Sequence, residues 1–460
     1  MDEAEMRGVL GLTADSRAVR PGWLFAALPG ARADGRAYIG EAVARGAVAV
    51  LAPEGTPWPP GVPPRRLITA RDPRARLAEL AVAFFGRPPE RLAAVTGTNG
   101  KTSTADFLRQ MLGMAGREAA SIGTLGVVAP GVAPGGGLTT PDPVSLARVL
   151  AGLAQAGVSD VALEASSHGL DQHRLDGLRF AAAGFTNLTR DHLDYHGSMA
   201  AYGAAKLRLF EALLKPGAAI RAMADLDPEL LARLRELAAA RRLDFAPVAV
   251  ERVEPRPEGQ VAHIGGRAVE LPLPGRFQAE NAALAASLAE ALGVGDALAL
   301  LPRLAGVRGR LERALVLPNG AAAYVDYAHT PDAIARLLAA LRPHASNRLH
   351  IVLGAGGDRD AGKRPLMGAA AARGADVVIV TDDNPRGEDP ALIRQAILAA
   401  CPGAVEIGDR RAAIAAALEG LRPGDVLVVA GKGHEQGQII GGEVIPFDDA
   451  AVIRELGGGA

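Results

Sequence analysis

The sequence predicts an α/β protein of three domains: a smaller N-terminal α/β domain, a central doubly wound parallel sheet with a phosphate loop (P-loop), and a C-terminal Rossmann-like sheet. Three observations support this prediction. The chain has 460 residues, enough for about three domains of roughly 150 residues each. Apolar runs of strand length alternate with helical segments after residue 90. Several of these runs end at glycine or polar residues just before a helix, where doubly wound sheets bind their ligands.

The composition is that of a globular protein and argues against two kinds of partner. A formal net charge of -1 offers no electrostatic basis for binding nucleic acid or an anionic membrane. No uncharged apolar run reaches the roughly 18 residues of a membrane helix, and the start MDEAEMRGVL is not that of a signal peptide. The one cysteine, Cys401, leaves no internal disulfide. We therefore expect a cytoplasmic protein without stable membrane association.

Residues 1–88 form the predicted N-terminal domain. Short alternating segments at 23–30 and 47–53 precede a helical stretch at 73–86. The proline pair of RPPE follows this helix and marks the boundary.

Residues 89–308 form the predicted central domain. LAAVTG at 92–97 is a predicted strand, and the segment at 102–116 has helical periodicity and ends on glycine. The runs VALEA and FAAAGFTNL are typical of strands buried on both faces of a parallel sheet. A helix at 279–293 precedes the end of the domain.

Residues 309–460 form the predicted C-terminal domain. Its strands are AAAYVDYA, HIVLGAGG, DVVIVTDDN and DVLVVAGKG, and each ends at small or polar residues before a helix. This pattern predicts a second doubly wound sheet, with ligands at the carboxyl ends of the strands.

The stretch TGTNGKTST at 96–104 is the strongest chemical signal. The general phosphate loop G-x-x-x-x-G-K-[ST] would begin with a glycine at position 95, where this chain has Val95. A shorter loop can do the same work: Gly97 and Gly100 let the backbone approach phosphates, Lys101 reaches the terminal phosphates, and Thr102 offers a hydroxyl to magnesium. The alternative is a glycine-rich turn that contains GKT by chance.

This short loop resembles the ATP loop of the Mur ligases and folylpolyglutamate synthetases, in which it is the usual form. Those enzymes join an amino acid to a carboxylate through an acyl phosphate. The resemblance covers essentially the whole chain in the right order. It implies that ATP binds to these residues: Gly97, Thr98, Asn99, Gly100, Lys101, Thr102, Asn281 and Asp326.

A magnesium site is expected beside the loop. Glu164 ends a predicted strand, and Mg²⁺ prefers one or two carboxylates with phosphate oxygens and water; a capping or solvated glutamate is the alternative. The resemblance implies that Lys206 is carbamylated by CO₂ (N6-carboxylysine) and, with Glu164 and His192, holds a second magnesium. The predicted metal ligands are thus Thr102, Glu164, His192 and Lys206. The predicted catalytic residues are Lys101, Glu164, His192 and Lys206. A surface lysine is the alternative for Lys206, although it is one of only five lysines in an arginine-rich chain.

Polar residues of the first two predicted domains match positions that hold a UDP-muramyl-peptide in the family. Thr139 and Thr140 precede a helix, and from the sequence alone capping is their better interpretation. The resemblance instead implies substrate binding by Ser16, Arg32, Thr139, Thr140, Ser166, Gln172 and Arg174. Ala31-Arg32 replaces the family's usual His-Gln pair.

Two loops of the third domain indicate the amino-acid substrate. Arginine pairs two-pronged with carboxylates, so Arg359 and Arg386 could hold an amino acid; pairing with Asp358, Asp360 or Glu388 is the alternative. DNPR at 383–386 resembles the corresponding stretch of the enzymes that add meso-diaminopimelate. In those enzymes the arginine meets the extra carboxylate of diaminopimelate. The implied binding residues are Arg359, Asp383, Asn384, Pro385, Arg386, Gly431 and Glu435. Lys432 and His434 receive no role.

The resemblance thus implies an ATP- and Mg²⁺-dependent ligase, expected to be a monomer, that adds meso-diaminopimelate to the D-Glu side-chain carboxylate of UDP-MurNAc-L-Ala-D-Glu in peptidoglycan precursor synthesis. Three alternatives stay open. The enzyme could add L-lysine or L-ornithine, it could be a folylpolyglutamate synthetase-like ligase, or it could be a P-loop NTPase that joins nothing.

Overall fold

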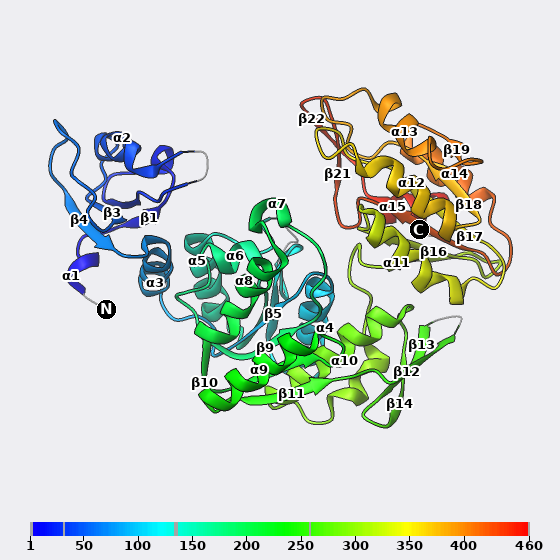
Figure 1. The fold of residues 1–460 in the computed structure, drawn as a ribbon, viewed down its shortest axis with the longest axis horizontal. Helices are drawn as coiled ribbons and strands as arrows, with labels where there is room; N and C mark the ends of the chain where they lie inside the picture. Colours follow the sequence, from blue (N-terminus) through cyan, green and yellow to red (C-terminus); the bar gives the residue numbers. More distant parts are fainter. Residues whose placement is uncertain (1–2, 31–32, 133–136, 257–258, 459–460) are drawn as a thin grey trace. The chain divides into compact units, whose positions relative to one another are not determined.

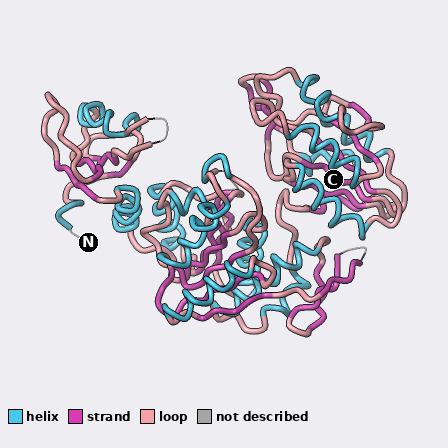
Figure 2. Tube along the Cα trace, viewed as in Figure 1, coloured by secondary structure: helices cyan, strands magenta, loops and turns pink. Residues whose placement is uncertain are grey.

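The α/β prediction is confirmed in a computed structural model, which describes residues 3–30, 33–132, 137–256 and 259–458 (Figure 1). Helices and strands alternate along most of the chain (Figure 2). The chain divides into two compact units, one of Met1–Ala249 with Asn281–Ala297 and one of Val250–Glu280 with Leu298–Ala460. Within the described ranges, no helix has the length and apolarity needed to cross a membrane.

The first unit begins with a four-stranded parallel sheet in the order β1-β2-β3-β4. Its strands are β1 (Gly11–Thr13), β2 (Trp23–Ala26), β3 (Ala49–Pro53) and β4 (Arg66–Ala70), and its helices are α1 (Glu3–Met6), η1 (Ser16–Ala18), η2 (Gly35–Tyr38), α2 (Ile39–Ala44) and α3 (Pro73–Phe85). Helix α3 starts where the Asp72 carboxylate accepts the N–H groups of Arg74 and Ala75, with Pro73 in the first turn.

The second sheet of this unit has seven strands in the order β11-β10-β9-β5-β8-β6-β7. They are β5 (Arg91–Thr96), β6 (Ala119–Gly123), β7 (Gly126–Val128), β8 (Asp160–Glu164), β9 (Phe180–Phe185), β10 (Leu214–Met223) and β11 (Asp244–Val248). Only the β6–β7 pair among these described strands is antiparallel. The surrounding helices are α4 (Lys101–Met114), α5 (Pro143–Gln155), α6 (Ser167–Asp171), α7 (Leu193–His196), α8 (Met199–Ala212), α9 (Pro228–Arg241) and α10 (Arg276–Ala291).

The register of this sheet positions the site. Val95 of β5 lies opposite Glu164 of β8, and Thr96 lies opposite Phe185 of β9. The carboxyl ends of the three strands therefore meet at one edge, where the loop after Thr96, the Glu164 side chain and Thr186 come together.

Three sheets are found among the described residues of the second unit. An antiparallel sheet is formed by β12 (Arg252–Arg256), β13 (Gly259–Ile264) and β14 (Arg267–Leu271), and a hairpin by β21 (Gly437–Ile440) and β22 (Glu443–Pro446). The large sheet has the order β15-β16-β20-β17-β18-β19, from β15 (Glu312–Val316), β16 (Ala322–Asp326), β17 (Leu349–Leu353), β18 (Val377–Val380), β19 (Val405–Glu406) and β20 (Val426–Ala430). The η3 turn (Ala297–Arg303) precedes it.

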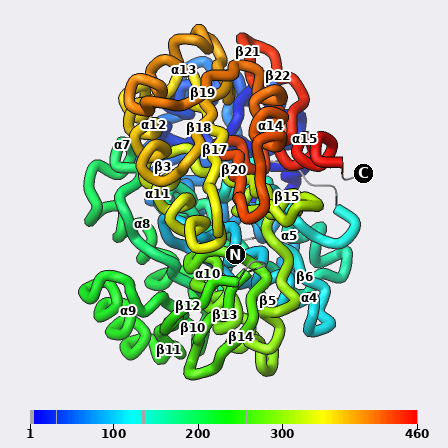
Figure 3. The backbone as a smooth tube through the Cα atoms, turned by 90° about the vertical axis from the view of Figure 1, so that its right-hand side faces the viewer, coloured from blue at the N-terminus to red at the C-terminus, as the bar shows by residue number. Residues whose placement is uncertain are grey.

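Helices cover both faces of this large sheet (Figure 3). On one face lie α11 (Pro331–Leu341), α12 (Lys363–Gly374) and α13 (Pro390–Leu398), with η4 (Arg342–His344) after α11; on the other lie α14 (Arg410–Glu419) and α15 (Asp449–Leu456). Adjacent strand residues serve opposite cores: Val428 packs with the first set and Val429 with the second. The predicted doubly wound sheet is confirmed, whereas the boundaries at 88 and 308 stay a prediction.

Candidate active site

The phosphate loop lies between β5 and α4, as the sequence predicted. Gly97 and Gly100 have φ values of +142° and +85°. A Cβ at Gly97 would collide with Thr186 Oγ1, and one at Gly100 would collide with Asn281 Oδ1. Only glycine therefore fits at either position. The loop between them is held by Asn187, whose Oδ1 accepts the N–H of Asn99 at 2.9 Å.

Two lysine ammonium groups lie against the carbonyls of this loop. Lys101 Nζ donates to Thr98 O at 2.7 Å, and Lys206 Nζ donates to Gly97 O at 2.7 Å. Lys206 is 1% exposed, so the surface-lysine interpretation is wrong. Burial, reinforced by the nearby Lys101 charge, lowers the pKa of Lys206 well below its ordinary range.

Tyr202 lies beside both Lys206 and His192. Its ring centroid is 4.4 Å from Lys206 Nζ and 6.2 Å from the centroid of the His192 ring. Its hydroxyl donates to Thr98 Oγ1 at 3.1 Å, and burial raises the pKa of Tyr202 to about 12. His192 has a left-handed backbone with φ of +51°. Two of the four predicted metal ligands, His192 and Lys206, are thus adjacent to one aromatic side chain.

Glu164 is 2% exposed at the end of β8, so it is neither a cap nor a solvated surface residue. Its Oε2 accepts the Thr102 hydroxyl at 3.0 Å, and its Oε1 accepts the Thr124 N–H at 2.8 Å. A buried carboxylate next to a hydroxyl is a hard-oxygen pair that suits Mg²⁺. No group of three His, Cys, Asp or Glu side chains among the described residues could hold a metal alone, and Mg²⁺ sites with phosphate and water ligands do not require one.

Thr140 and Ser166 extend this polar site away from Glu164. Thr140 Oγ1 donates to Glu164 O at 2.8 Å and accepts the Ser166 N–H at 2.9 Å. Arg174 donates to Thr140 O at 2.6 Å and to Gln172 Oε1 at 2.7 Å. Thr139 Oγ1 lies 3.1 Å from Thr124 Oγ1. The residues predicted to hold the muramyl-peptide in this part of the chain therefore form one connected network.

The capping interpretation of Thr139 and Thr140 is wrong. Helix α5 is capped by Asp142, whose carboxylate accepts the N–H groups of Val144 and Ser145, with Pro143 in the first turn. A carboxylate directly before Pro143 is in the better position to cap, so the threonines are left for other contacts.

The other residues predicted to bind the UDP-sugar or ATP lie in separate parts of the chain. Ser16 is buried and donates to Glu41 Oε2 at 3.0 Å, while Arg32 lies outside the described residues. Asn281 Oδ1 is within 3.4 Å of the Thr104 hydroxyl. In the other unit, both Asp326 carboxylate oxygens accept backbone N–H groups, from Leu311 at 2.7 Å and Ala328 at 2.8 Å, and burial raises the pKa of Asp326.

The second unit contains a polar cavity of about 290 Å³ at the carboxyl ends of β16, β17, β18 and β20. Six of the seven predicted amino-acid-binding residues line it: Arg359, Asp383, Asn384, Arg386, Gly431 and Glu435. The seventh, Pro385, lies between two of them and accepts the Glu388 N–H at 3.1 Å. Tyr327 and His329, which lie one and three positions after the predicted Asp326, also line the cavity but were not predicted from the sequence. Neither was Lys363, which lines it as well.

Arg386 of this cavity is held by the backbone. Arg386 has φ of +52° and donates to Gly357 O at 2.8 Å. Glu388 is paired with Arg364 at 2.8 Å, and Asp358 Oδ2 accepts the Gly387 N–H at 3.0 Å. These two carboxylates therefore have other partners than Arg386, and its guanidinium can meet an anionic ligand.

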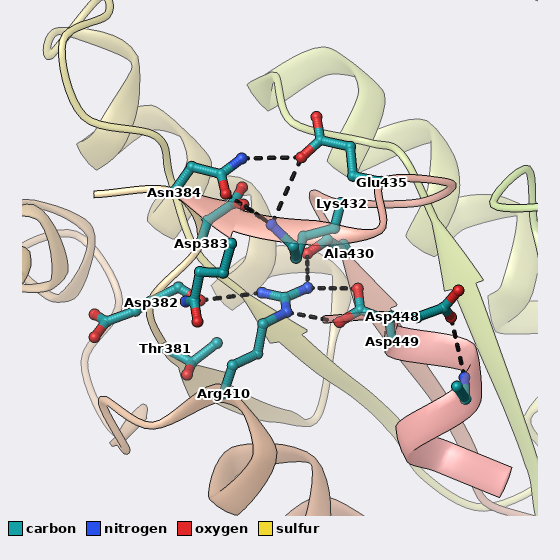
Figure 4. A network of polar contacts seen from close by, with 12 residues as sticks. Thr381, Asp382, Asp383, Asn384, Arg410, Ala430, Lys432, Glu435, Asp448 and Asp449 are labelled. Carbon is teal, nitrogen blue, oxygen red and sulfur yellow. Dashed lines mark hydrogen bonds and ion pairs between the residues drawn. The ribbon is translucent and has the colours of Figure 1, made fainter. Parts of the chain in front are cut away.

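Lys432 lies behind this cavity, fully buried, among Asp383, Asn384 and Glu435 (Figure 4). No role is predicted for it from the sequence. Its retention as lysine in an arginine-rich chain was the only signal, because two of its partners, Asp383 and Asn384, lie 49 and 48 positions away along the chain.

Three family profiles match most of the chain. The Mur ligase family catalytic domain matches residues 9–85, the Mur ligase middle domain residues 95–289, and the Mur ligase, glutamate ligase domain residues 309–433.

Individual proteins are similar over nearly their full length. The UDP-N-acetylmuramoyl-L-alanyl-D-glutamate–2,6-diaminopimelate ligase of Caulobacter vibrioides is 53% identical, over 96% of this chain and 94% of its own. The protein of that name from Rhizobium meliloti is 52% identical, over 98% and 94%.

Solved structures agree with this relationship. One described as the structure of a UDP-N-acetylmuramoyl-L-alanyl-D-glutamate–2,6-diaminopimelate ligase has a TM-score of 0.71 at 35% identity, covering 98% of this chain and 95% of that one. The Mycobacterium tuberculosis folylpolyglutamate synthase complexed with ADP has a TM-score of 0.62 at 21% identity, covering 78% and 91%, and supports the fold alone. With matching profiles in all three blocks and relatives at half identity or more, the chain belongs to the Mur ligase family.

Proposed function

We propose that this protein is an ATP-dependent ligase that joins meso-diaminopimelate to the D-Glu side-chain carboxylate of UDP-MurNAc-L-Ala-D-Glu. The observation that carries the proposal is the cavity of the second unit, which combines Arg359 and Arg386 with Asp383 and Glu435. An amino acid with two amino-acid ends needs both cationic and anionic partners. The names of the relatives at 53% and 52% identity support the same substrate.

The reaction has two steps. The terminal phosphoryl group of ATP passes to the D-Glu carboxylate oxygen, and ADP leaves. The neutral amine of diaminopimelate then attacks the acyl carbon, the C–O bond to phosphate breaks, and a proton is lost as the amide forms. Gly97, Thr98, Asn99, Gly100, Lys101 and Thr102 hold the ATP phosphates, with Asn281 and Asp326 at the nucleoside. Catalysis by these groups is positioning and charge stabilisation.

Magnesium fits beside this loop. Thr102 and Glu164 would hold one Mg²⁺ ion, and Glu164 and His192, with Lys206 as its carbamate, would hold a second. The bound ions would neutralise charge on the transferring phosphoryl oxygens. The carbamate forms when the neutral Lys206 amine attacks CO₂ and releases a proton. Burial of Lys206 and its lowered pKa support this step, since they favour the neutral amine.

The muramyl-peptide is held by Ser16, Arg32, Thr139, Thr140, Ser166, Gln172 and Arg174, and these positions stay a prediction. The network that joins Thr140, Ser166 and Arg174 to Glu164 supports it, because it places several donors beside the phosphoryl-transfer site. In the cavity of the second unit, Arg386 meets the distal carboxylate of diaminopimelate with Arg359, Asp383, Asn384, Pro385 and Gly431 around it, and Glu435 meets the distal amine. We further propose that the protein works as a cytoplasmic monomer.

The test is phosphate release from ATP in the presence of UDP-MurNAc-L-Ala-D-Glu, with meso-diaminopimelate, L-lysine or L-ornithine as the third substrate. We expect release and a tripeptide product only with diaminopimelate, and loss of that preference in Arg386→Ala. Release with lysine or ornithine would keep the ligase and reject the role of Arg386. Release without any amino acid would favour the NTPase alternative, and ligation of glutamate to a folate would favour a folylpolyglutamate synthetase.

A further inference from the structure

Lys432 is a buried cation that the reaction described above does not use. Its side chain is 0% exposed, and its Nζ lies 2.8 Å from Asn384 Oδ1, 3.4 Å from Asp383 Oδ1 and 3.6 Å from Glu435 Oε2 (Figure 4). These three partners line the polar cavity, whereas Lys432 lies behind its wall. A buried charge of this kind is costly unless its partners are well placed.

The amide of Asn384 is oriented by Lys432. Asn384 Oδ1 accepts from Lys432 Nζ and, at 2.9 Å, from the Ile439 N–H. With two donors on this oxygen, the amide nitrogen has to point the other way, and it donates to Glu435 Oε2 at 2.9 Å. Lys432 therefore determines which end of the Asn384 amide meets Glu435.

The charge of Lys432 also links two carboxylates of the cavity wall. Asp383 follows β18 and Glu435 follows β20, and both face the same ammonium group. A cation between two carboxylates offsets their mutual repulsion. Glu435 is the more exposed of the pair, with a side chain 35% exposed against 8% for Asp383, so it is the one that can receive a ligand.

Other contacts hold the loop on which Lys432 lies. The Gly431 N–H donates to Asp326 O at 3.1 Å, and Arg410 Nη2 donates to Ala430 O at 3.0 Å. Arg410 is itself fixed by a bidentate pair with Asp449, at 2.7 and 2.8 Å. The loop path is therefore secured without the Lys432 side chain. The Lys432 carbonyl accepts the Glu435 N–H at 3.0 Å, whereas its ammonium group contacts side chains of the cavity wall.

We propose that Lys432 is a positioning residue that sets Asn384 and Glu435 for recognition of the distal ammonium group of the amino-acid substrate. This inference rests on the proposed function, because it assigns the determinant of that substrate's distal end. Lys432 does not touch the substrate; it acts through Glu435, which receives the distal ammonium group as a carboxylate, and through Asn384, which keeps Glu435 in place.

The test measures KM for meso-diaminopimelate and for ATP, with kcat, in wild type, Lys432→Met, Lys432→Gln, Glu435→Gln and the double variant Lys432→Met/Glu435→Gln. We expect Lys432→Met to raise KM for diaminopimelate about tenfold or more, with KM for ATP unchanged and kcat within about threefold, because a charge-assisted contact is lost only in the amino-acid cavity. Lys432→Gln, which can still donate to Asn384 Oδ1, should recover part of the loss. In the Glu435→Gln background, Lys432→Met should raise KM for diaminopimelate by less than about a further threefold.

An unchanged KM for diaminopimelate in Lys432→Met, or multiplicative effects in the double variant, would overturn the proposal. Equal rises in the KM values of ATP and diaminopimelate would also overturn it. So would a circular dichroism spectrum showing that both Lys432→Met and Lys432→Gln fail to fold, because each of these results would assign Lys432 to general stability. Absence of wild-type turnover with diaminopimelate would instead reject the proposed function, and this inference with it.

Discussion

At the scale of single residues, the phosphate loop is unusual in having two lysines against its carbonyls. Lys101 starts α4 and Lys206 comes from α8, and their ammonium groups bond to neighbouring carbonyls of the same turn. One of them is 1% exposed and has a lowered pKa. The two lysines therefore lie in different environments, and the lowered pKa of the buried Lys206 favours its neutral amine form.

Lys101→Met should reduce kcat by about 10²–10³-fold, because a preorganised cation at the transferring phosphoryl group is lost. Lys215→Met is the matched control, since the Lys215 ammonium bonds to Glu90 O at the other end of β5, and it should keep wild-type kcat. Steady-state phosphate release measures both. Equal losses in the two variants would mean that the effect is not local to the loop.

Lys206 should bear a carbamate carbon that is visible by ¹³C NMR in protein equilibrated with ¹³C-bicarbonate. Since only the neutral amine reacts with CO₂ and the pKa is lowered, the signal should be present near neutral pH and should decline as the pH falls. Lys206→Arg should lack it, whereas Lys215→Arg should keep it. A signal that persists in Lys206→Arg would place the carbamate on another amine.

His434 should make stability depend on pH. Burial, with help from Arg310 and Arg308, lowers the pKa of His434 to about 4, and in the unfolded chain it is about 6.5. Below pH 6.5 the unfolded state binds a proton that the folded state does not, so stability falls as the pH drops from 6.5 to 4. After allowance for solvent screening, His434→Phe should reduce that loss by on the order of 1 kcal/mol. Urea unfolding of wild type and His434→Phe at pH 7 and pH 5 measures this difference. The same change in unfolding free energy with pH in both proteins would contradict the prediction.

Several site residues were predictable from the sequence because their signal is local. Gly97, Gly100 and Lys101 lie within one short turn, and Glu164 directly ends a strand. The error at Thr139 and Thr140 arose because Asp142 competes for the same helix start. Lys432 could not be assigned from the sequence. Its neighbours along the chain indicate neither that it is buried nor that it contacts Asp383 and Asn384.

At the scale of elements, the strands buried on both faces were the most predictable. β8, β9, β17, β18 and β20 are apolar runs that end at small or polar residues, and each is confirmed. The antiparallel sheet of β12, β13 and β14 was not predicted. Its strands carry charges and Pro255, and β12 has no fully buried residue, so no apolar pattern marked it.

The starts of α14 and α15 are joined by the buried Arg410–Asp449 pair, in which both side chains are 0% exposed. Arg410→Met should lower the free energy of unfolding by about 3–5 kcal/mol, because it leaves the Asp449 charge buried without its partner. Arg410→Met/Asp449→Leu should recover most of this loss. Urea unfolding measures both variants.

Arg411→Met is the control for that comparison. It removes a neighbouring arginine whose pair with Glu455 is exposed, so its unfolding midpoint should stay close to wild type. A loss in Arg411→Met as large as in Arg410→Met would contradict the importance of burial.

At the scale of the whole molecule, one chain supplies the phosphate loop in its first unit and the amino-acid cavity in its second. Both sets of groups are needed for ligation. If the protein is a monomer, mixing Lys101→Met chains with Arg386→Ala chains, which have lost the preference for diaminopimelate, should not restore the diaminopimelate-specific activity of wild type. Phosphate release from the mixture, with light scattering for a mass of 47.2 kDa, tests this. Recovery of activity on mixing would indicate a shared site and an oligomer.

The order of segments along the chain has a consequence for synthesis on the ribosome. Leu284 and Leu288 of α10 pack against Gly184 of β9, but residues 250–280, which belong to the second unit, are made between β11 and this part of α10. At roughly 5–20 residues per second, translation leaves this face of β9 uncovered for several seconds after the last strand of its sheet has been made. The nascent chain therefore passes through a stage in which all strands of the central sheet are present while one apolar face is uncovered. At this stage it is most prone to aggregation.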